Sequence, residues 1–285
     1  MDRAAPYLFV FLWSTGFVGA RLGVHHAEPL TFLLVRYAVV AGLMAAASLL
    51  TRAPWPRGRQ AAHVAVAGLL VHAAYLGGVF VALARGLPAG ATSLVVGMQP
   101  VLTAVGAGLL LGERVTPRQW LGLGLGFAGV ALVLSGKVGL GAAAAAPGPA
   151  LGAALAALGG ITLGTLYQKR FCPAFDLRTG AVVQFSAAFA GTLPVALATE
   201  SFRVEWTAEL LLALAWLVLV LSLGAISLLN VLIRRGTAVN VARLFFLVPP
   251  STALLAFLFF GETLRGAALA GMGLAAVGVY LARAR

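Results

Sequence analysis

This sequence is short of acidic residues and cysteine, and it has no long polar segment. Its 285 residues include 8 Asp and Glu against 20 Lys and Arg, and only 10% of the chain is charged. Cys172 is the single cysteine, so the chain can form neither an internal disulfide nor a cysteine-based metal site. No cluster of Ser, His and Asp and no set of metal ligands stands out. We therefore expect no enzyme, no metal and no cofactor.

What the chain has instead is apolar sequence, with 61% hydrophobic residues. A soluble domain of this size cannot bury so much apolar surface, so we predict an all-α integral membrane protein. A spanning helix needs about 20 apolar residues, and the runs lack the alternation of barrel strands. The ten predicted transmembrane helices are 4–23, 31–50, 61–84, 89–111, 117–136, 149–168, 179–199, 208–231, 238–260 and 265–282.

The net charge of +12 follows membrane topology rather than a nucleic-acid surface. If the N-terminus is inside, the inner loops and both ends carry 13 basic residues and the outer loops carry 5. The positive-inside rule then predicts that both termini are cytoplasmic, next to anionic lipid. We expect a lipid bilayer and a small-molecule substrate as partners, and no nucleic acid. The outer five are Arg21, Arg85, Lys137, Arg203 and Arg265.

The second half of the sequence repeats the first at an offset of 149 residues. Pro100–Leu132 aligns without a gap with Pro249–Leu281, and 13 of the 33 positions are identical. Five spans in each half is an odd number, so the second half enters the membrane upside down. Such an inverted repeat is common in secondary transporters. We predict two repeats, residues 1–140 and 141–285, joined by a linker over Lys137–Pro149.

Prolines and glutamates recur at matching places in the two halves. Pro100 in the fourth span, and Pro249 and Pro250 in the ninth, lie near mid-membrane, where a kink could bend the helix around a central site. Glu113 and Glu262 end these same spans. We interpret the prolines as hinges and the glutamates as anchors for the helix ends. Proton or ion coupling is the alternative role for the glutamates.

The fifth and tenth spans are rich in small residues. Gly124–Gly129 has the spacing of a dinucleotide-binding loop, but it lies inside a charge-free helix with no strand before it, so we reject that function. Gly122 and Gly126 have the GxxxG spacing that lets helices approach closely, as do the small residues of 267–275. We predict that the fourth, fifth, ninth and tenth spans form a rigid scaffold. Its surface would also allow a homodimer.

Two arginines fall inside predicted spans, Arg36 in the second and Arg243 in the ninth. A charge in the bilayer costs about 2.5–3.5 kcal/mol on insertion scales, so such a side chain usually faces a cavity or a partner. Both residues also lie close enough to a helix end for the side chain to reach the interface. Both interpretations stay open, and both arginines are candidate substrate ligands.

Other polar and aromatic residues in six of the spans predict a hydrated central cavity. His72 and Tyr75 share one helix face because they are three residues apart. All eight acidic residues fall in loops or at helix ends, so the cavity has no carboxylate to bind a cation. The candidate substrate-binding residues are Trp13, Ser14, Arg36, Tyr37, His72, Tyr75, Gln99, Gln168, Gln184 and Arg243.

The chain resembles the EamA group of the drug/metabolite transporter (DMT) superfamily over essentially its whole length. The matching features are the two five-helix halves, the glycine-rich fifth span, Leu12-Trp13-Ser14, Arg36-Tyr37, and the helix-4 proline followed by Gly112-Glu113. The resemblance implies a rigid part made of helices 4, 5, 9 and 10, with the other six helices around a central cavity. It also implies export of amino acids or related metabolites by alternating access.

We therefore predict a secondary transporter that exports a small polar metabolite, an amino acid or a related carboxylate or zwitterion, across a bacterial cytoplasmic (inner) membrane. One rival is a proton-coupled multidrug exporter of the same fold that uses Glu113 or Glu262. The resemblance argues against it, because the mid-helix glutamate of the small multidrug branch is missing. A second rival is a membrane-embedded enzyme acting on lipids, for which His25, His26 and Glu28 are the only nearby candidates.

Overall fold

The computed structural model describes residues 4–23, 26–87, 89–135, 148–260 and 266–283. Within these ranges the chain is helical, as predicted, and its one extended pairing is an isolated antiparallel bridge between Ala27 and Val204. Glu262, His25 and most of the predicted linker lie outside the described residues.

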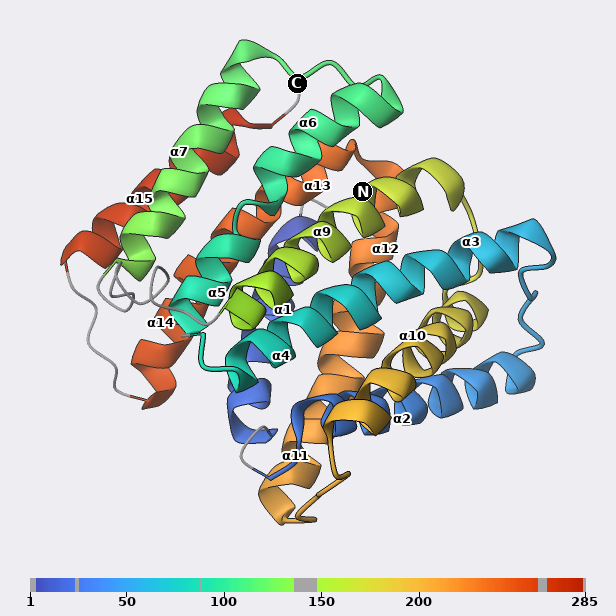
Figure 1. The fold of residues 1–285 in the computed structure, drawn as a ribbon. Helices are drawn as coiled ribbons and strands as arrows, with labels where there is room; N and C mark the ends of the chain where they lie inside the picture. Colours follow the sequence, from blue (N-terminus) through green and yellow to red (C-terminus); the bar gives the residue numbers. More distant parts are fainter. Residues whose placement is uncertain (1–3, 24–25, 88, 136–147, 261–265, 284–285) are drawn as a thin grey trace.

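The helices follow one another in the same order in each half of the chain (Figure 1). The first half contains α1 (Ala5–Gly23), α2 (Pro29–Leu50), α3 (Arg59–Gly68), η1 (Leu69–Ala74), α4 (Tyr75–Ala84), α5 (Ala89–Val96), α6 (Gln99–Leu111) and α7 (Pro117–Leu134). The second half contains α9 (Gly148–Phe171), α10 (Leu177–Thr199), α11 (Ala208–Trp216), η2 (Leu217–Ala225), α12 (Ile226–Arg235), α13 (Ala238–Ala242), η3 (Arg243–Leu247), α14 (Val248–Phe260) and α15 (Gly266–Leu281).

Eight helical stretches of the described chain are long and apolar enough to cross a membrane. They correspond to the second through ninth predicted spans, from Pro29–Leu50 to Ala238–Leu255. The helix α15, at the tenth predicted span, is apolar but shorter. Length and composition in the structure therefore identify eight spans.

Two of these stretches contain a π-helical segment at corresponding places, which the sequence pattern did not predict. In the first half, η1 lies between α3 and α4, and in the second half η2 lies between α11 and α12. A π-helical turn is rare, and it is often found at functional sites because it changes the direction in which side chains point. The polar residues His72 and Ser222 lie in these two segments.

The three predicted hinge prolines lie at the starts of helical segments, whereas Pro194 lies inside α10. The helix α5 ends at Val96, and Pro100 follows in the first turn of α6. Pro249 and Pro250 lie in the first turn of α14, directly after the 3-10 segment η3. Proline is well tolerated there because the first backbone N–H groups of a helix have no partner within it.

The helices α7 and α15 pack backbone against backbone. A Cβ atom added to Gly129 would lie 2.4 Å from the backbone nitrogen of Ala275, and one added to Gly278 would lie 2.3 Å from that of Gly126. Only glycine fits at such an approach. The two helices run antiparallel, because Gln119 at the start of α7 donates to the carbonyl of Ala282 after α15.

The helices α2 and α10 form a second antiparallel pair (Figure 1). Glu200, after α10, contacts Leu30 at the start of α2, and Thr179, at the start of α10, contacts Pro54 after α2. Around this pair, α9 packs against α3, η1 and α4, and α1 packs against α11, η2 and α14. The core enclosed by these helices contains the polar residues described next.

Candidate substrate site

Arg36 is buried in the middle of the helix bundle. It lies on α2 with 5% of its surface exposed, and its Nε donates to the hydroxyl of Ser222 in η2 at 3.0 Å. Among the described residues no carboxylate lies within ion-pairing distance of it. A buried cation without a counter-ion is costly, and a negatively charged ligand could offset that cost.

Aromatic side chains surround this arginine. The Tyr37 hydroxyl donates to the backbone carbonyl of His72 at 3.0 Å, which holds η1 against α2. The His72 ring stacks on Phe185 of α10, with 4.2 Å between the ring centroids and 17° between the planes. Trp13 of α1 contacts Tyr75, which follows η1 directly. Elements from both halves of the chain therefore meet here.

An amide chain extends from this group. The Gln184 side-chain nitrogen donates to the Gln168 carbonyl oxygen at 3.3 Å, and the Gln168 nitrogen donates to the Asn230 carbonyl oxygen at 2.6 Å. All three side chains are at most 4% exposed. The two bonds fix the orientation of each amide relative to its neighbour, since in each pair a nitrogen donates and an oxygen accepts.

We call the following residues the Arg36 cluster: Trp13, Arg36, Tyr37, His72, Tyr75, Gln168, Gln184, Phe185, Ser222 and Asn230. Seven of them are among the predicted substrate-binding residues. Ser222, Asn230 and Phe185 were not named, because single small polar or aromatic residues in an apolar span do not stand out. Ser222 had one signal, since it lies close to the position that corresponds to His72 at the repeat offset.

Three predicted ligands lie elsewhere in the structure. The Ser14 hydroxyl donates to the carbonyls of Val10 and Val248, so it joins α1 to α14. The Gln99 nitrogen donates to Thr103 one turn further along α6. Arg243 donates to the Val279 carbonyl near the end of α15. Their hydrogen bonds are to helix neighbours, and they do not join the Arg36 cluster.

Glu113 lies between the end of α6 and the start of α13. Its Oε1 accepts a hydrogen bond from the backbone N–H of Ala238 at 3.0 Å, where a carboxylate also interacts favourably with the helix dipole. This contact ties the α6–α7 connection to the α12–α13 connection. Tyr7 of α1 and Arg283 both lie near Arg243, so the start of α1 and the end of α15 are at this end of the bundle too.

Glutamates connect two loops at the opposite end. Glu200 accepts from the backbone N–H groups of Leu30 and Thr31, both at 2.7 Å, and from the Thr31 hydroxyl. Glu28 accepts from the backbone N–H groups of Ser201 and Arg203, and these bonds lower the pKa of its carboxyl below the ordinary value. We call these contacts the glutamate clasp.

At the end of the bundle near Glu113, the connections that follow α2 and α9 are joined through neutral groups. There the Thr179 hydroxyl donates to the Pro54 carbonyl at 2.7 Å, and the Gln60 nitrogen donates to the Ala174 carbonyl at 2.6 Å. The nearby Asp176 pairs with Arg178 beside it in sequence, which lowers the pKa of the Asp176 carboxyl to about 2. Both ends of the bundle are therefore closed over the Arg36 cluster.

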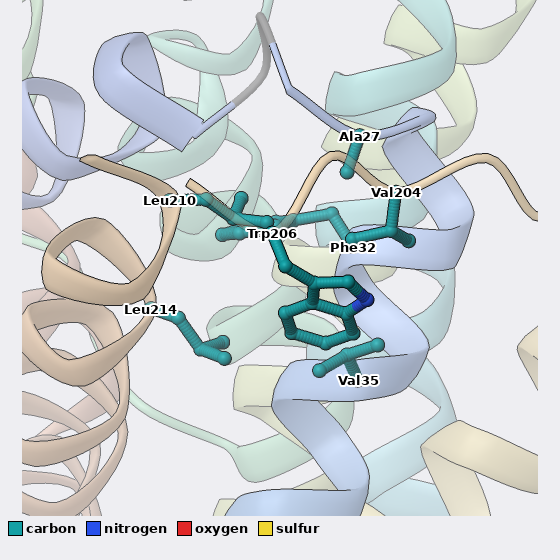
Figure 2. Close-up of a pocket in the computed structure, with 7 residues that line it drawn as sticks. All are labelled: Ala27, Phe32, Val35, Val204, Trp206, Leu210 and Leu214. Carbon is teal, nitrogen blue, oxygen red and sulfur yellow. The ribbon is translucent and has the colours of Figure 1, made fainter. Parts of the chain in front are cut away.

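An apolar pocket lies under the glutamate clasp, between α2 and α11. Figure 2 shows the Trp206 indole above Val35, with Leu214 across from it and Ala27 and Val204 at the rim. The pocket has no polar lining that would bind a charged group.

Comparison with known proteins gives one consistent family. A model of the EamA-like transporter family matches residues 6–135 and again residues 150–284. A crystal structure with 22% sequence identity superposes with a TM-score of 0.77 over 98% of this chain and 94% of the other. That likeness establishes the fold.

Three curated relatives cover almost the whole chain. The uncharacterized inner membrane transporter YedA of Escherichia coli is 27% identical over 91% of this chain and 83% of its own. A probable amino-acid metabolite efflux pump of Salmonella typhimurium is 27% identical, over 98% and 94%. A probable terminal-alkyne amino-acid exporter of Streptantibioticus cattleyicolor is 29% identical, over 99% and 93%.

Proposed function

Since this chain belongs to the EamA-like transporter family, we propose that it exports an α-amino acid or a closely related zwitterion, which binds at the Arg36 cluster. It is a multi-pass membrane protein and a transporter. The proposal of the substrate class is supported by two relatives that are named for the efflux or export of amino acids or their metabolites.

The observation that carries the proposal is the buried Arg36, which has no carboxylate partner among the residues that the structure describes. A guanidinium presents several N–H donors in a plane, a geometry that matches a carboxylate. Ser222 occupies only the Nε donor of this group. The free energy lost in burying the charge is recovered when a substrate carboxylate binds, so the site favours an anionic or zwitterionic solute over a cation.

We further propose ten transmembrane helices in two inverted repeats, residues 1–140 and 141–285. The two separate family matches support this division. So does the antiparallel packing of equivalent helices, α2 with α10 and α7 with α15, which is the arrangement expected around a twofold axis in the membrane plane. In this arrangement α1 and α15 also cross the membrane, in addition to the eight stretches identified by length and composition.

For the orientation, we propose that both termini are cytoplasmic and that the glutamate clasp faces outwards. The start of α1 and the end of α15 lie at one end of the bundle, as an even number of spans requires. The loops at that end carry most of the basic residues, in agreement with the positive-inside rule. We propose a bacterial inner membrane as the location, because the relative YedA is described as an inner membrane transporter.

The transport cycle would use the two closures in turn. Release of the contacts around Pro54 and Ala174 would open the cluster to the cytoplasm, and release of the glutamate clasp would open it outwards. The prolines at the starts of α6 and α14 lie next to interruptions in the helical backbone hydrogen bonds. These helices can bend there. The glycine-packed α7–α15 pair would stay fixed meanwhile.

Counterflow in proteoliposomes tests the substrate class. Vesicles loaded with unlabelled alanine, threonine, leucine, phenylalanine, aspartate or putrescine are diluted into the labelled form of the same compound. We expect accumulation with at least one neutral amino acid and none with putrescine. Arg36→Gln should lower this rate by at least about 30-fold, equivalent to the ~2 kcal/mol lost with a charged partner.

Arg57→Gln is the matched control, because Arg57 is exposed in the α2–α3 connection. It should transport like the wild type, and both variants should give the same yield of folded protein. A counterflow rate of Arg36→Gln equal to that of the wild type would refute the assignment of the substrate site to the Arg36 cluster. Accumulation of putrescine driven by a pH gradient would favour the multidrug rival instead.

A further inference from the structure

The Arg36 cluster contains two equivalent pairs of residues with different chemistry. Gln184 occupies in α10 the place that Arg36 occupies in α2, 148 residues earlier. Each of these residues reaches into the π-helical segment of the other half of the chain. Arg36 contacts Ser222 in η2, and Gln184 contacts His72 in η1. One half of the site is therefore cationic and the other half is neutral.

Hydrogen bonds fix the orientation of the neutral pair. The Gln184 nitrogen donates to Gln168, and the buried Gln184 carbonyl oxygen gains a partner when it accepts the proton of the His72 ring, so we assign the bond in that direction. The Nε2 atom of His72 has no hydrogen-bond partner, although the residue is 1% exposed. The ring nitrogen that contacts Gln184 is therefore Nδ1, and it carries the proton.

This arrangement makes Nε2 a buried acceptor without a donor. A second proton on the ring would place a positive charge next to the Arg36 cation, so a neutral ring is the favourable state. A buried acceptor that is left unpaired costs free energy until a donor reaches it. A solute that enters the site can supply this donor.

Resting on the proposed function, we infer that His72 Nε2 accepts a hydrogen bond from the α-ammonium group of the substrate, while Arg36 binds its carboxylate. Gln184 acts as a positioning residue that holds the His72 ring in the accepting orientation. The site then recognises both charged ends of an α-amino acid. A carboxylate without an amino group satisfies only the Arg36 half of the site.

The test compares two solutes in competition with labelled phenylalanine counterflow. Unlabelled phenylalanine has both charged groups, and 3-phenylpropionate lacks only the ammonium group. For the wild type we expect phenylalanine to compete at least about tenfold better, the equivalent of ~1.4 kcal/mol. His72→Phe should abolish this preference by weakening phenylalanine while leaving 3-phenylpropionate unchanged.

The variant should fold, since the new ring can stack on Phe185 and the bond from Tyr37 goes to the backbone of residue 72. His63→Phe is the matched control, because His63 lies in α3, stacks on Phe171 and bonds the Tyr167 hydroxyl. It should keep the wild-type preference. Gln184→Leu should reduce the preference as His72→Phe does, and Gln184→Asn should restore part of it.

Two results would overturn the inference. One is an unchanged preference in His72→Phe, and the other is an equal loss of competition by both solutes. Either can be told apart from failure of the proposed function, in which the wild type itself would show no amino-acid counterflow with any compound of the panel.

Discussion

The α7–α15 pair and the Arg36 cluster are built in opposite ways. In the pair, glycines bring two backbones into contact, and side chains contribute little to the join. In the cluster, long polar side chains from five or more elements meet, and several of their atoms have one hydrogen bond or none. Close backbone packing resists movement, whereas a cluster of partly satisfied polar groups gains free energy when a ligand enters. We propose that this difference separates a rigid part of the bundle, the α7–α15 pair, from its working part, the Arg36 cluster.

The largest expected effect is the loss of stability when the close contact between α7 and α15 is disrupted. In Gly129→Leu the new side chain would meet the backbone of Ala275, so the helices must separate at a cost of about 3 kcal/mol or more. We expect little monodisperse protein in size-exclusion chromatography after extraction in detergent. Gly124→Leu on the same helix is the control, because nothing lies within 4 Å of its Cβ position. Equal behaviour of the two variants would contradict a packing role.

In the Arg36 cluster we expect a substitution to stabilise the protein, in contrast to Gly129→Leu. Arg36→Met removes a buried charge that has no counter-ion, so it should raise the free energy of unfolding by about 1–2 kcal/mol. The melting temperature should then rise by about 2–8 °C, measured by tryptophan fluorescence during heating, to which the buried Trp13 contributes. Transport should be lost in the same variant. A lower melting temperature would mean that Arg36 supports the fold and has no unpaired charge to offer a substrate.

A smaller effect is expected at the glutamate clasp, which borders the working part. Backbone N–H donors lower the pKa of Glu28, so its stabilising contribution is present above the ordinary pKa and is lost as the pH falls through the lowered one. The melting temperature of the wild type should therefore exceed that of Glu28→Gln by the same amount from pH 8 to pH 5. The gap should close below about pH 4. A gap that closes near neutral pH would contradict the ionised clasp.

The smallest effect concerns Cys172, which follows α9. The residue is 1% exposed, and burial raises the pKa of its thiol to about 11. Because the thiolate is the reactive form, the folded protein should not react with a maleimide at neutral pH. Mass spectrometry should find label only after denaturation. Rapid labelling of the native protein would show that the end of the bundle around Cys172 opens readily.

The sequence predicts the rigid part better than the working part. Glycine spacing is a local pattern, and the repeat at an offset of 149 residues places it twice, so the α7–α15 contact could be expected. Arg36, His72 and Gln184 also stand out, since charge and amide groups are rare in apolar spans. Ser222 and Asn230 could not be selected, because which face of a helix they occupy depends on the π-helical segments.

Those segments have no signature in the sequence. Apart from His72 and Ser222, both run through apolar residues, where the hydrophobic pattern has no period that would reveal an extra residue per turn. The sequence leaves the role of Arg243 open for a related reason. Its distance from the helix end allowed either a central site or a bond near the membrane surface, and the structure has the bond to Val279.

Substrate protection of a thiol in the cluster tests the central claim most directly. In Ser222→Cys, labelling by N-ethylmaleimide should slow in the presence of the amino acid that gives counterflow. The protection should disappear when Arg36→Gln is added, and Ser186→Cys on the exposed face of α10 should show none. A labelling rate at position 222 that does not respond to the amino acid would contradict a substrate site beside Arg36.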